Sequence, residues 1–470
     1  MAQAAKRPLT DDAAKVALPE PHLACATLAD PYEQDLDGVL SLIPAPLRAE
    51  AEEKALQALD MFRTHFSRGK LRLCEVPYER EDLTSLQEEA NKLMEGRTDI
   101  VHFGTGGSSL GAQALAQVGK LLFSGIPLSG AGRPRMHFLD NLESPWLERA
   151  LKRCDLDNTA FLIVSKSGRT PETVAQAILA IEILKQRGLA DEIPHRILMI
   201  SDPEDPALSG RNILRRLAAD HGIRVLDHEP DVGGRFSVLT NVGMLPALLI
   251  GLDASRIRDG ACAVIDPILK AKAAAALPPV AGAMVHYALK RYLGMNIVVT
   301  MPYTSRLRLF AVWLQQLWAE SLGKEGRGTQ PVTAVGPVDQ HSQLQLYLDG
   351  PNDRFFNIIQ VIGKRDSYRI PESYAEYTDL AGFCIADLTH AQQRATTDAL
   401  LNRGRPVRVF RIDSVNEYAL GGLFMHFMIE TILYAYMLGI NPFDQPAVEE
   451  SKILTRTYLS EMKDTGTQHT

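Results

Sequence analysis

The sequence predicts an α/β fold of two doubly wound parallel sheets, each an αβα sandwich, with helical extensions at both ends. Two observations support this prediction. From residue 100 onwards, short apolar runs of the kind found in buried parallel strands alternate with helical segments, and a second set of such runs begins near residue 297. The 470 residues also exceed the usual size of one hydrophobic core, so two units are expected.

The first half of the chain divides into an extension and an α/β unit. Residues 1–95 have helical patterns at 50–65 and 83–94, and they predict a helical N-terminal extension without strands. Residues 96–250 form the first α/β unit. Its strands are expected at 100–103, 136–139, 161–164 and 197–200.

The second half repeats the pattern and ends in helices. Residues 251–415 form the second unit, with strands expected at 297–300, 356–361 and 407–410. Residues 416–470 form a helical C-terminal segment with a break at 441–444. Its first part, 421–438, is strongly apolar, but His426 and Glu430 interrupt it, so we expect a buried helix and no membrane span.

Composition excludes several classes of protein. The net charge is -7, which gives no basic surplus for nucleic acid, and the mean hydropathy is -0.08, far from that of a membrane protein. The five cysteines are far apart and form no CxxC motif, and the histidines lack HxH or HxxxH spacing, so we expect neither a disulfide framework nor a metal site. No secretory signal is recognisable, and we expect a cytoplasmic protein.

Residues 161–173 predict a phosphate pocket, because a buried strand leads through hydroxyls and a glycine into a helix. Thr170 suits the N-cap and Pro171 the first helical position. The free N–H groups and dipole of the helix start, together with the hydroxyls of Ser165, Ser167 and Thr170, favour a bound dianion. A well-capped turn without a ligand is the alternative interpretation.

Two glycine-containing turns are further candidates. Residues 104–111 follow the strand at 100–103 and open a helix; the third glycine of a dinucleotide fingerprint is absent, and the serines favour a phosphoryl group or sugar hydroxyl. A tight turn is the alternative. At 233–237, paired glycines precede Arg235, whose fixed charge could stabilise an oxyanion, although a solvated surface arginine is equally common.

The candidate acid–base residues lie in the second half. Glu320 and Gln316 are one turn apart at the end of a helix that Gly323 closes, so the carboxylate is a candidate general base. His341 in a loop could exchange a proton near neutral pH. Gln445 and Lys452 lie at the start of the last helix and could face a cleft. For each of these residues, a solvated side chain without function is the ordinary alternative.

Six collinear segments resemble the phosphoglucose isomerase (glucose-6-phosphate isomerase) family, which is built from two sugar-isomerase (SIS) domains. They are GTGGSSLG at 104–111, SKSGRTPET at 165–173, GGRFSVLTNVG at 233–243, QQLWAESLGKEG at 315–326, QHS at 340–342 and NPFDQPAVEESK at 441–452. Thr105 and Ala447 depart from the usual pattern, where an apolar residue and a glycine stand, and neither departure removes a functional group.

The resemblance implies an isomerase that interconverts glucose 6-phosphate and fructose 6-phosphate through an enediol, in glycolysis and gluconeogenesis, with no cofactor. It implies a homodimer in which His341 comes from the partner subunit. An isomerase of different or broader specificity and a non-catalytic SIS-type phosphosugar sensor are the alternatives. The implied roles are Glu320 as the base, Arg235 opposite the enediolate, His341 and Lys452 in ring opening, and Gly107, Ser108, Ser165, Lys166, Ser167, Thr170, Gln316 and Gln445 in substrate binding.

Overall fold

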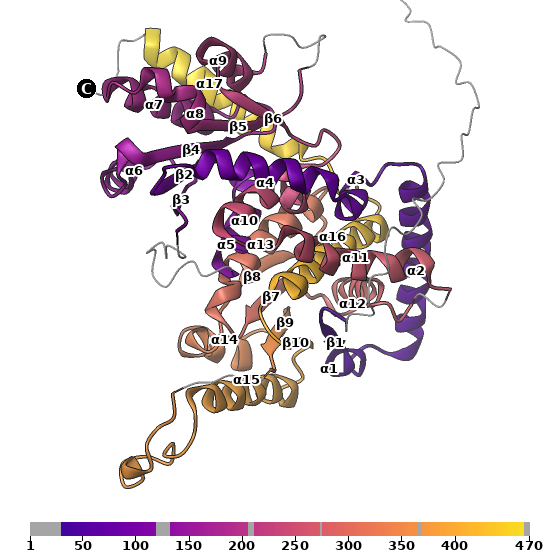
Figure 1. The fold of residues 1–470 in the computed structure, drawn as a ribbon. Helices are drawn as coiled ribbons and strands as arrows, with labels where there is room; N and C mark the ends of the chain where they lie inside the picture. The colour runs from indigo at the N-terminus through magenta and orange to yellow at the C-terminus, as the bar shows by residue number, and fades with distance from the viewer. Residues whose placement is uncertain (1–29, 119–131, 205–210, 273–274, 364–367, 465–470) are drawn as a thin grey trace, which may run out of the picture.

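The computed structural model describes residues 30–118, 132–204, 211–272, 275–363 and 368–464, and within them two sheets lie on either side of a layer of helices (Figure 1). The first sheet has the order β3-β2-β4-β5-β6, and all its neighbouring strands are parallel. Its strands are β2 (Asp99–Phe103), β3 (Arg135–Leu139), β4 (Thr159–Val164), β5 (Ile197–Ser201) and β6 (Arg224–Asp227). The four strands expected in this unit are confirmed, and β6 is additional.

The second sheet has the order β1-β10-β9-β7-β8. Its strands are β1 (Glu33–Asp35), β7 (Ile297–Pro302), β8 (Gln330–Thr333), β9 (Arg354–Val361) and β10 (Val407–Ile412). Strands β7 to β10 pair in parallel, which confirms the predicted sheet and adds the short β8.

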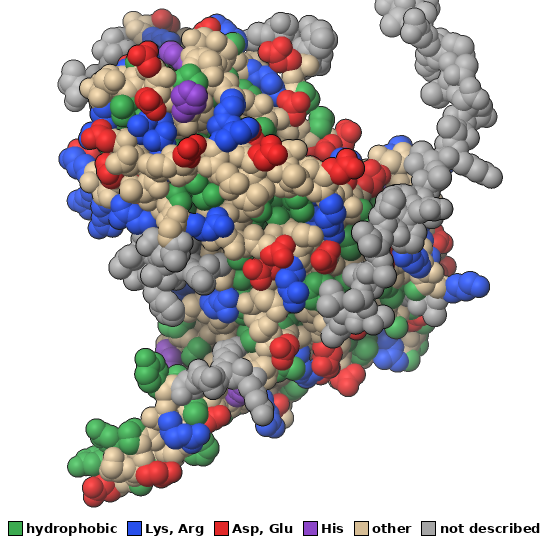
Figure 2. All heavy atoms as spheres, in the orientation of Figure 1, with side chains coloured by type: hydrophobic (Ala, Val, Ile, Leu, Met, Phe, Trp, Pro, Cys, Tyr) green, Lys and Arg blue, Asp and Glu red, His purple; other side chains and the backbone are tan. Residues whose placement is uncertain are grey.

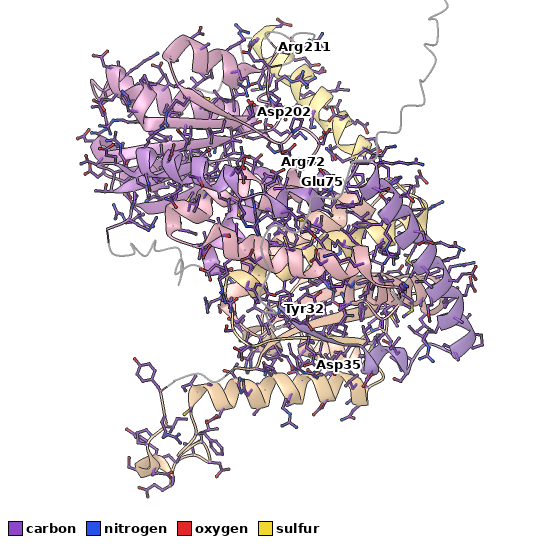
Figure 3. All side chains as sticks on the ribbon, turned by 45° about the vertical axis from the view of Figure 1, so that its right-hand side comes forward. Tyr32, Asp35, Arg72, Glu75, Asp202 and Arg211 are labelled. Carbon is purple, nitrogen blue, oxygen red and sulfur yellow. The ribbon has the colours of Figure 1, made fainter. Side chains whose placement is uncertain are left out.

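Strand β1 corrects the prediction of a strand-free N-terminal extension. It pairs antiparallel with β10 and places Gln34 opposite Phe410. Next to it, the Tyr32 hydroxyl lies 2.6 Å from Nδ1 of His426, and Tyr32 and Asp35 lie beside the lower sheet in Figure 3. Three residues carry too little pattern to indicate a strand, so the free edge of β10 decides this conformation.

The helices follow the strands in the expected alternation. The N-terminal segment contains α1 (Asp37–Leu40), α2 (Ala45–Ser67), α3 (Arg72–Glu75) and α4 (Glu81–Met94). The first unit adds α5 (Leu110–Val118), α6 (Ser144–Lys152), α7 (Pro171–Gln186), α8 (Ile193–Arg196), α9 (Ile213–His221) and α10 (Asn241–Ile250). The rest of the described chain contains α11 (Ala254–Lys270), α12 (Pro278–Leu293), α13 (Arg308–Leu322), α14 (Leu344–Asp349), α15 (Ile385–Asn402), α16 (Glu417–Leu438) and α17 (Glu449–Asp464).

One hydrophobic core joins the two halves. Alternate strand residues of both sheets, such as Leu162 in β4 and Phe355 in β9, belong to the same buried cluster as side chains of α2, α4, α10, α12, α13 and α16. The opposite faces have separate cores, with α7 against the first sheet and α14 and α15 against the second. The helices between the sheets therefore belong to both units.

Helix α16 crosses the middle of this shared layer. It is long and apolar enough to span a membrane, but 89% of its apolar window is buried inside the protein, as expected for a core helix. Its Glu430 accepts two hydrogen bonds from Arg408 of β10, and His426 is also within hydrogen-bonding distance of it. All three side chains are buried, so the polar residues that interrupt the apolar run satisfy one another.

The strand order of the first sheet creates a topological switch point at its carboxyl edge. The chain passes from β2 to β3 on one side and then returns to β4 on the other side of β2. The loops after β2 and β4 therefore diverge at this point, where ligands of doubly wound sheets bind. On the face shown in Figure 2, acidic and basic side chains are interspersed and form no broad basic area, as the net charge of -7 predicts.

Candidate active site

The turn after β2 lies against two other parts of the chain. A Cβ atom at Gly107 would lie 2.2 Å from the carbonyl carbon of Gly234, and one at Gly106 would lie 2.9 Å from Nε2 of Gln316. At Gly107 the near atoms are backbone, which leaves no room for a side chain, and Gly106 has φ +58°, a left-handed conformation that favours glycine. The motif at 104–111 thus brings the first sheet into contact with the Arg235 segment and with α13. Ser108 is half-buried in the same turn.

The loop after β4 carries the hydroxyls that the sequence predicts to bind a phosphate. Thr170 is the N-cap residue of α7 with extended backbone, and Pro171 occupies the first turn. The Thr170 hydroxyl makes no capping bond; it accepts one from the Ser165 hydroxyl at 3.0 Å. Gly168 has φ +61°, and a Cβ there would overlap the Asn212 side chain. Ser167 is exposed, and its hydroxyl accepts the Arg169 N–H at 3.3 Å.

Lys166 connects this loop to the segment before Arg235. Its ammonium group donates to the carbonyl oxygens of Pro230 and Val232, the latter at 2.8 Å. Burial lowers its pKa, and the nearby Asp202 carboxylate partly opposes that shift. Lys166 therefore joins the loop after β4 to residues 230–232, whether or not it also contacts an anion.

Thr173 is a residue that the sequence reasoning missed. It lies in the first turn of α7, and its Oγ1 is buried without a hydrogen-bond partner among the described residues. A buried hydroxyl without a partner is costly unless a ligand or water satisfies it. The sequence signal that could have identified Thr173 is its position within SKSGRTPET, three residues after the N-cap.

Arg235 is the centre of the site. It lies in the short helix Gly234–Leu239, and only 3% of its surface is exposed. Its Nη1 donates to the Glu320 carboxylate at 3.2 Å and to Oε1 of Gln445 at 2.8 Å. Its Nη2 donates to the carbonyl oxygens of Pro442 and Asp444 at 2.5 and 3.1 Å.

The remaining donor of Arg235 reveals a second missed residue. Nε donates at 2.8 Å to the hydroxyl of Ser321, which is fully buried next to Glu320 on α13. These five bonds match the five N–H donors of a guanidinium, so its plane is fixed. Burial lowers the pKa of Arg235, and the Glu320 carboxylate opposes this effect.

Glu320 accepts a bond on each oxygen and is still partly exposed. Its Oε1 accepts a 2.9 Å bond from Nε2 of Gln316, and its Oε2 accepts the bond from Arg235. The side chain remains 36% exposed, so a ligand can reach the carboxylate. The predicted end of the helix at Gly323 is confirmed.

His341 and Lys452 are not brought to this cluster by any contact that the structure shows. His341 is exposed in the short helix Val338–His341, which follows β8. Lys452 is exposed on α17 and pairs with Glu449. Their roles stay predictions, whereas Arg235, Glu320, Gln316 and Gln445 form one bonded cluster.

One group of side chains has the composition of a metal site. The ligand atoms of Asp99, His137 and Cys154 lie within 4.8 Å of one another. However, the Asp99 carboxylate already accepts bonds from His137 at 2.7 Å, from Arg135 at 2.8 Å and from the Thr98 hydroxyl. The guanidinium at this position repels a cation, so the chemistry of the group does not fit a metal site.

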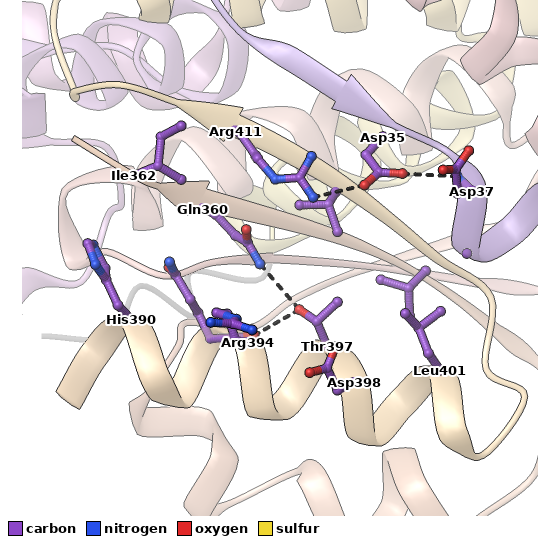
Figure 4. A pocket seen from close by; sticks show the side chains of 14 residues that line it. Asp35, Asp37, Gln360, Ile362, His390, Arg394, Thr397, Asp398, Leu401 and Arg411 are labelled. Carbon is purple, nitrogen blue, oxygen red and sulfur yellow. Dashed lines mark hydrogen bonds and ion pairs between the residues drawn. The ribbon is translucent and has the colours of Figure 1, made fainter. Parts of the chain in front are cut away.

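A cavity of about 460 Å³ lies in another part of the molecule (Figure 4). The cavity lies between α15 and the strands β9, β10 and β1. Its lining includes Gln360, Thr397 and Arg411. None of the residues of the Arg235 cluster lines it.

Comparisons with known proteins identify the family of this chain. A family model described as phosphoglucose isomerase matches residues 87–339, more than half of the chain. A glucose-6-phosphate isomerase of Rubrobacter xylanophilus is 37% identical over 385 residues, which are 81% of this chain and 87% of the relative. One of Carboxydothermus hydrogenoformans is 32% identical over 421 residues, 87% and 89% of the two chains.

Solved structures show the same fold. A hypothetical protein of Thermus thermophilus superposes with a TM-score of 0.79 at 30% identity over 91% of this chain and 99% of that one. A glucose-6-phosphate isomerase of Chlamydia trachomatis has a TM-score of 0.67 at 22% identity, over 82% of this chain and 74% of that one, and shows the fold alone. By its matched model and its relatives, this chain belongs to the phosphoglucose isomerase family.

Proposed function

We propose that this protein is an isomerase that interconverts glucose 6-phosphate and fructose 6-phosphate, as the names of its relatives indicate. The observation that best supports this function is the Glu320 carboxylate held between Gln316 and Arg235. It lies on α13, whose Gln316 contacts the turn that follows β2. A base, a fixed positive charge and an anion pocket are what such an isomerisation requires.

Glu320 acts as the general base. It removes the proton from C2 of the open-chain aldose, the electrons move to O1, and an enediolate forms. The same carboxylic acid then returns the proton to C1, and the O2 hydroxyl gives up its proton to O1, so that the carbonyl forms at C2 and a hydroxyl remains at C1. C1 is reduced as C2 is oxidised, so no external electrons are needed.

Arg235 supplies the positive charge opposite the enediolate. Because its five donors are already bonded to protein, it acts as a fixed charge in a buried place, where charges interact more strongly than in water. Gln316 contributes its Oε1, which is buried without a partner among the described residues and can accept a bond from a sugar hydroxyl.

The substrate phosphate binds between the turns after β2 and β4. Ser108, Ser165, Ser167 and Thr170 offer hydroxyls, and the start of α7 offers free N–H groups and the positive end of its dipole. Gly107 lets the backbone approach closely. Lys166 adds a positive charge to the same loop.

His341 and Lys452 open the sugar ring, and we propose that His341 comes from the partner subunit of a homodimer. This proposal is consistent with the exposure of His341 in the single chain. Aromatic side chains also stand exposed at 368–383, including Tyr368, Tyr377 and Phe383, which is typical of a surface that another protein covers.

The test is conversion of glucose 6-phosphate to fructose 6-phosphate by the purified protein, with EDTA present. In deuterated water, we expect deuterium at C1 of the product, because the proton is carried by an acid that exchanges with solvent. Mannose 6-phosphate in a parallel assay measures the breadth of specificity. Absence of turnover with glucose 6-phosphate would reject the proposed function.

A further inference from the structure

The turn at 441–445 connects the core helix α16 to α17 and carries Gln445 into the active site. Gln445 accepts the Arg235 bond, and the ring of Phe443 lies 5.6 Å from that of Phe236. Helix α17, which follows the turn, has no buried residue. The position of Gln445 therefore depends on what holds the turn itself.

Lys324 holds the same turn as Arg235, through different atoms. It lies two residues beyond the end of α13, and its ammonium group donates to the Asn441 carbonyl and pairs with the Asp444 carboxylate at 2.8 Å. The Lys324 side chain is 11% exposed and that of Asp444 is 52% exposed. The pair lowers the pKa of Asp444 mainly through its hydrogen bond, so the carboxylate is charged at neutral pH.

Two cations bond the 441–445 turn at different atoms. Arg235 binds the carbonyl oxygens of Pro442 and Asp444, whereas Lys324 binds the Asn441 carbonyl and the Asp444 carboxylate. Arg235 belongs to the catalytic cluster. Lys324 touches neither Glu320 nor Gln445 in any bond that the structure shows, so its influence on the reaction must pass through the turn.

We propose that Lys324 is a positioning residue that docks the 441–445 turn onto α13 through Asp444 and Asn441, and thereby keeps Gln445 against Arg235. The kinetic consequence rests on the proposed function; the docking itself does not.

The experiment compares Lys324→Met, Asp444→Asn and the double variant with the full-length wild type. Loss of a charge-assisted bond predicts a decrease in kcat/KM of about tenfold for each single variant. The double variant should be no worse than Lys324→Met, because both changes remove the same contact. Lys324→Arg, which can bond to the same two oxygens, should retain most of the activity.

Two further measurements separate docking from general stability. Hydrogen exchange of residues 441–464 should become faster in Lys324→Met, while exchange in β2 and β4 and the thermal midpoint stay as in wild type. Lys270→Met is the matched control, because Lys270 pairs at 2.8 Å with Asp266 on the exposed surface of α11. This control should change neither activity nor exchange at 441–464.

Unchanged exchange at 441–464 in both single variants would overturn the proposal. So would additive effects of the two substitutions, or a loss of activity that merely follows a lower thermal midpoint. If the wild type lacks isomerase activity, only the proposed function fails, and the exchange data still decide whether Lys324 docks the turn.

Discussion

At the scale of single residues, the site depends on one carboxylate between two donors. Glu320 is bonded by Gln316 on one oxygen and by Arg235 on the other, and Arg235 is itself held by Ser321 and by the 441–445 turn. Such fixed partners keep the proposed base oriented before the substrate arrives, so little reorganisation is needed in the transition state.

The substitution Glu320→Gln tests the base directly. The introduced amide keeps the shape of the side chain but cannot accept the C2 proton, so we expect kcat to fall by roughly 10²–10⁴-fold with little change in KM. Steady-state kinetics with glucose 6-phosphate give both constants. Wild-type turnover in this variant would move the role of base to another residue.

The substitution Gly107→Ala tests the contact between the turn after β2 and the Arg235 segment. A Cβ at this position would lie 2.2 Å from the Gly234 carbonyl carbon, so Gly107→Ala should push the two segments apart. A displacement on the order of 1 Å in an active site lowers kcat/KM by roughly 10²-fold.

Gly234→Ala is the comparison for this prediction. Its Cβ would lie 3.6 Å from Gly107, an ordinary van der Waals contact, so a much smaller effect is expected. Circular dichroism should show that both variants fold. Equal kinetic losses would mean that the close approach at Gly107 is not the cause.

At the scale of elements, the strand–loop–helix units around β2 and β4 carry the residues of the proposed anion site. The strands end side by side at the switch point, and α7 starts there with Thr170 as its N-cap. Strand β2 also contains His102, which is fully buried two residues before the loop that begins at Gly104. Neither of its ring nitrogens is bonded among the described residues.

His102 makes the stability of the fold depend on pH. Burial lowers its pKa to about 4, whereas an unfolded histidine has a pKa near 6.5. Between these values the unfolded chain binds one more proton than the folded chain, so stability falls as pH falls through this window, by at most about 1.4 kcal/mol per pH unit.

We therefore expect His102→Asn to weaken this dependence. Thermal midpoints of wild type and variant at pH 7, 6 and 5 give the comparison, and the quantity that matters is the change with pH, since the substitution also alters packing. The wild type should lose more of its midpoint between pH 7 and 5. Equal decreases of the thermal midpoint with pH in wild type and variant would show that His102 does not bind the extra proton on unfolding.

At the scale of the whole molecule, the two sheets share the helices between them, and the site draws residues from both halves. Gly107 and Arg235 come from the first half, and Glu320 and Gln445 from the second. The shared core keeps these residues at fixed separations, because close-packed interiors deform little.

The proposed homodimer is testable by mixing two inactive variants. If His341 acts across the interface, a hybrid of Glu320→Gln and His341→Ala subunits contains one intact site, made of Glu320 from one chain and His341 from the other. Random reassociation should then restore about a quarter of wild-type activity. Each variant alone, unfolded and reassociated in the same way, is the control. No recovery in verified hybrids would place His341 in the site of its own chain.

Much of this protein was predictable from the sequence alone. The alternation of short apolar runs and helices indicated the parallel sheets, and SKSGRTPET indicated a helix start at Pro171. These features were predictable because strand patterns, helix caps and turn glycines depend on a few neighbouring residues. Only the tertiary structure decided that β1 joins β10, that the helices between the sheets form one core, that Ser321 bonds Arg235, and that Lys324 bonds the 441–445 turn. These features join residues far apart in the chain, whose contacts leave no periodic pattern in the sequence.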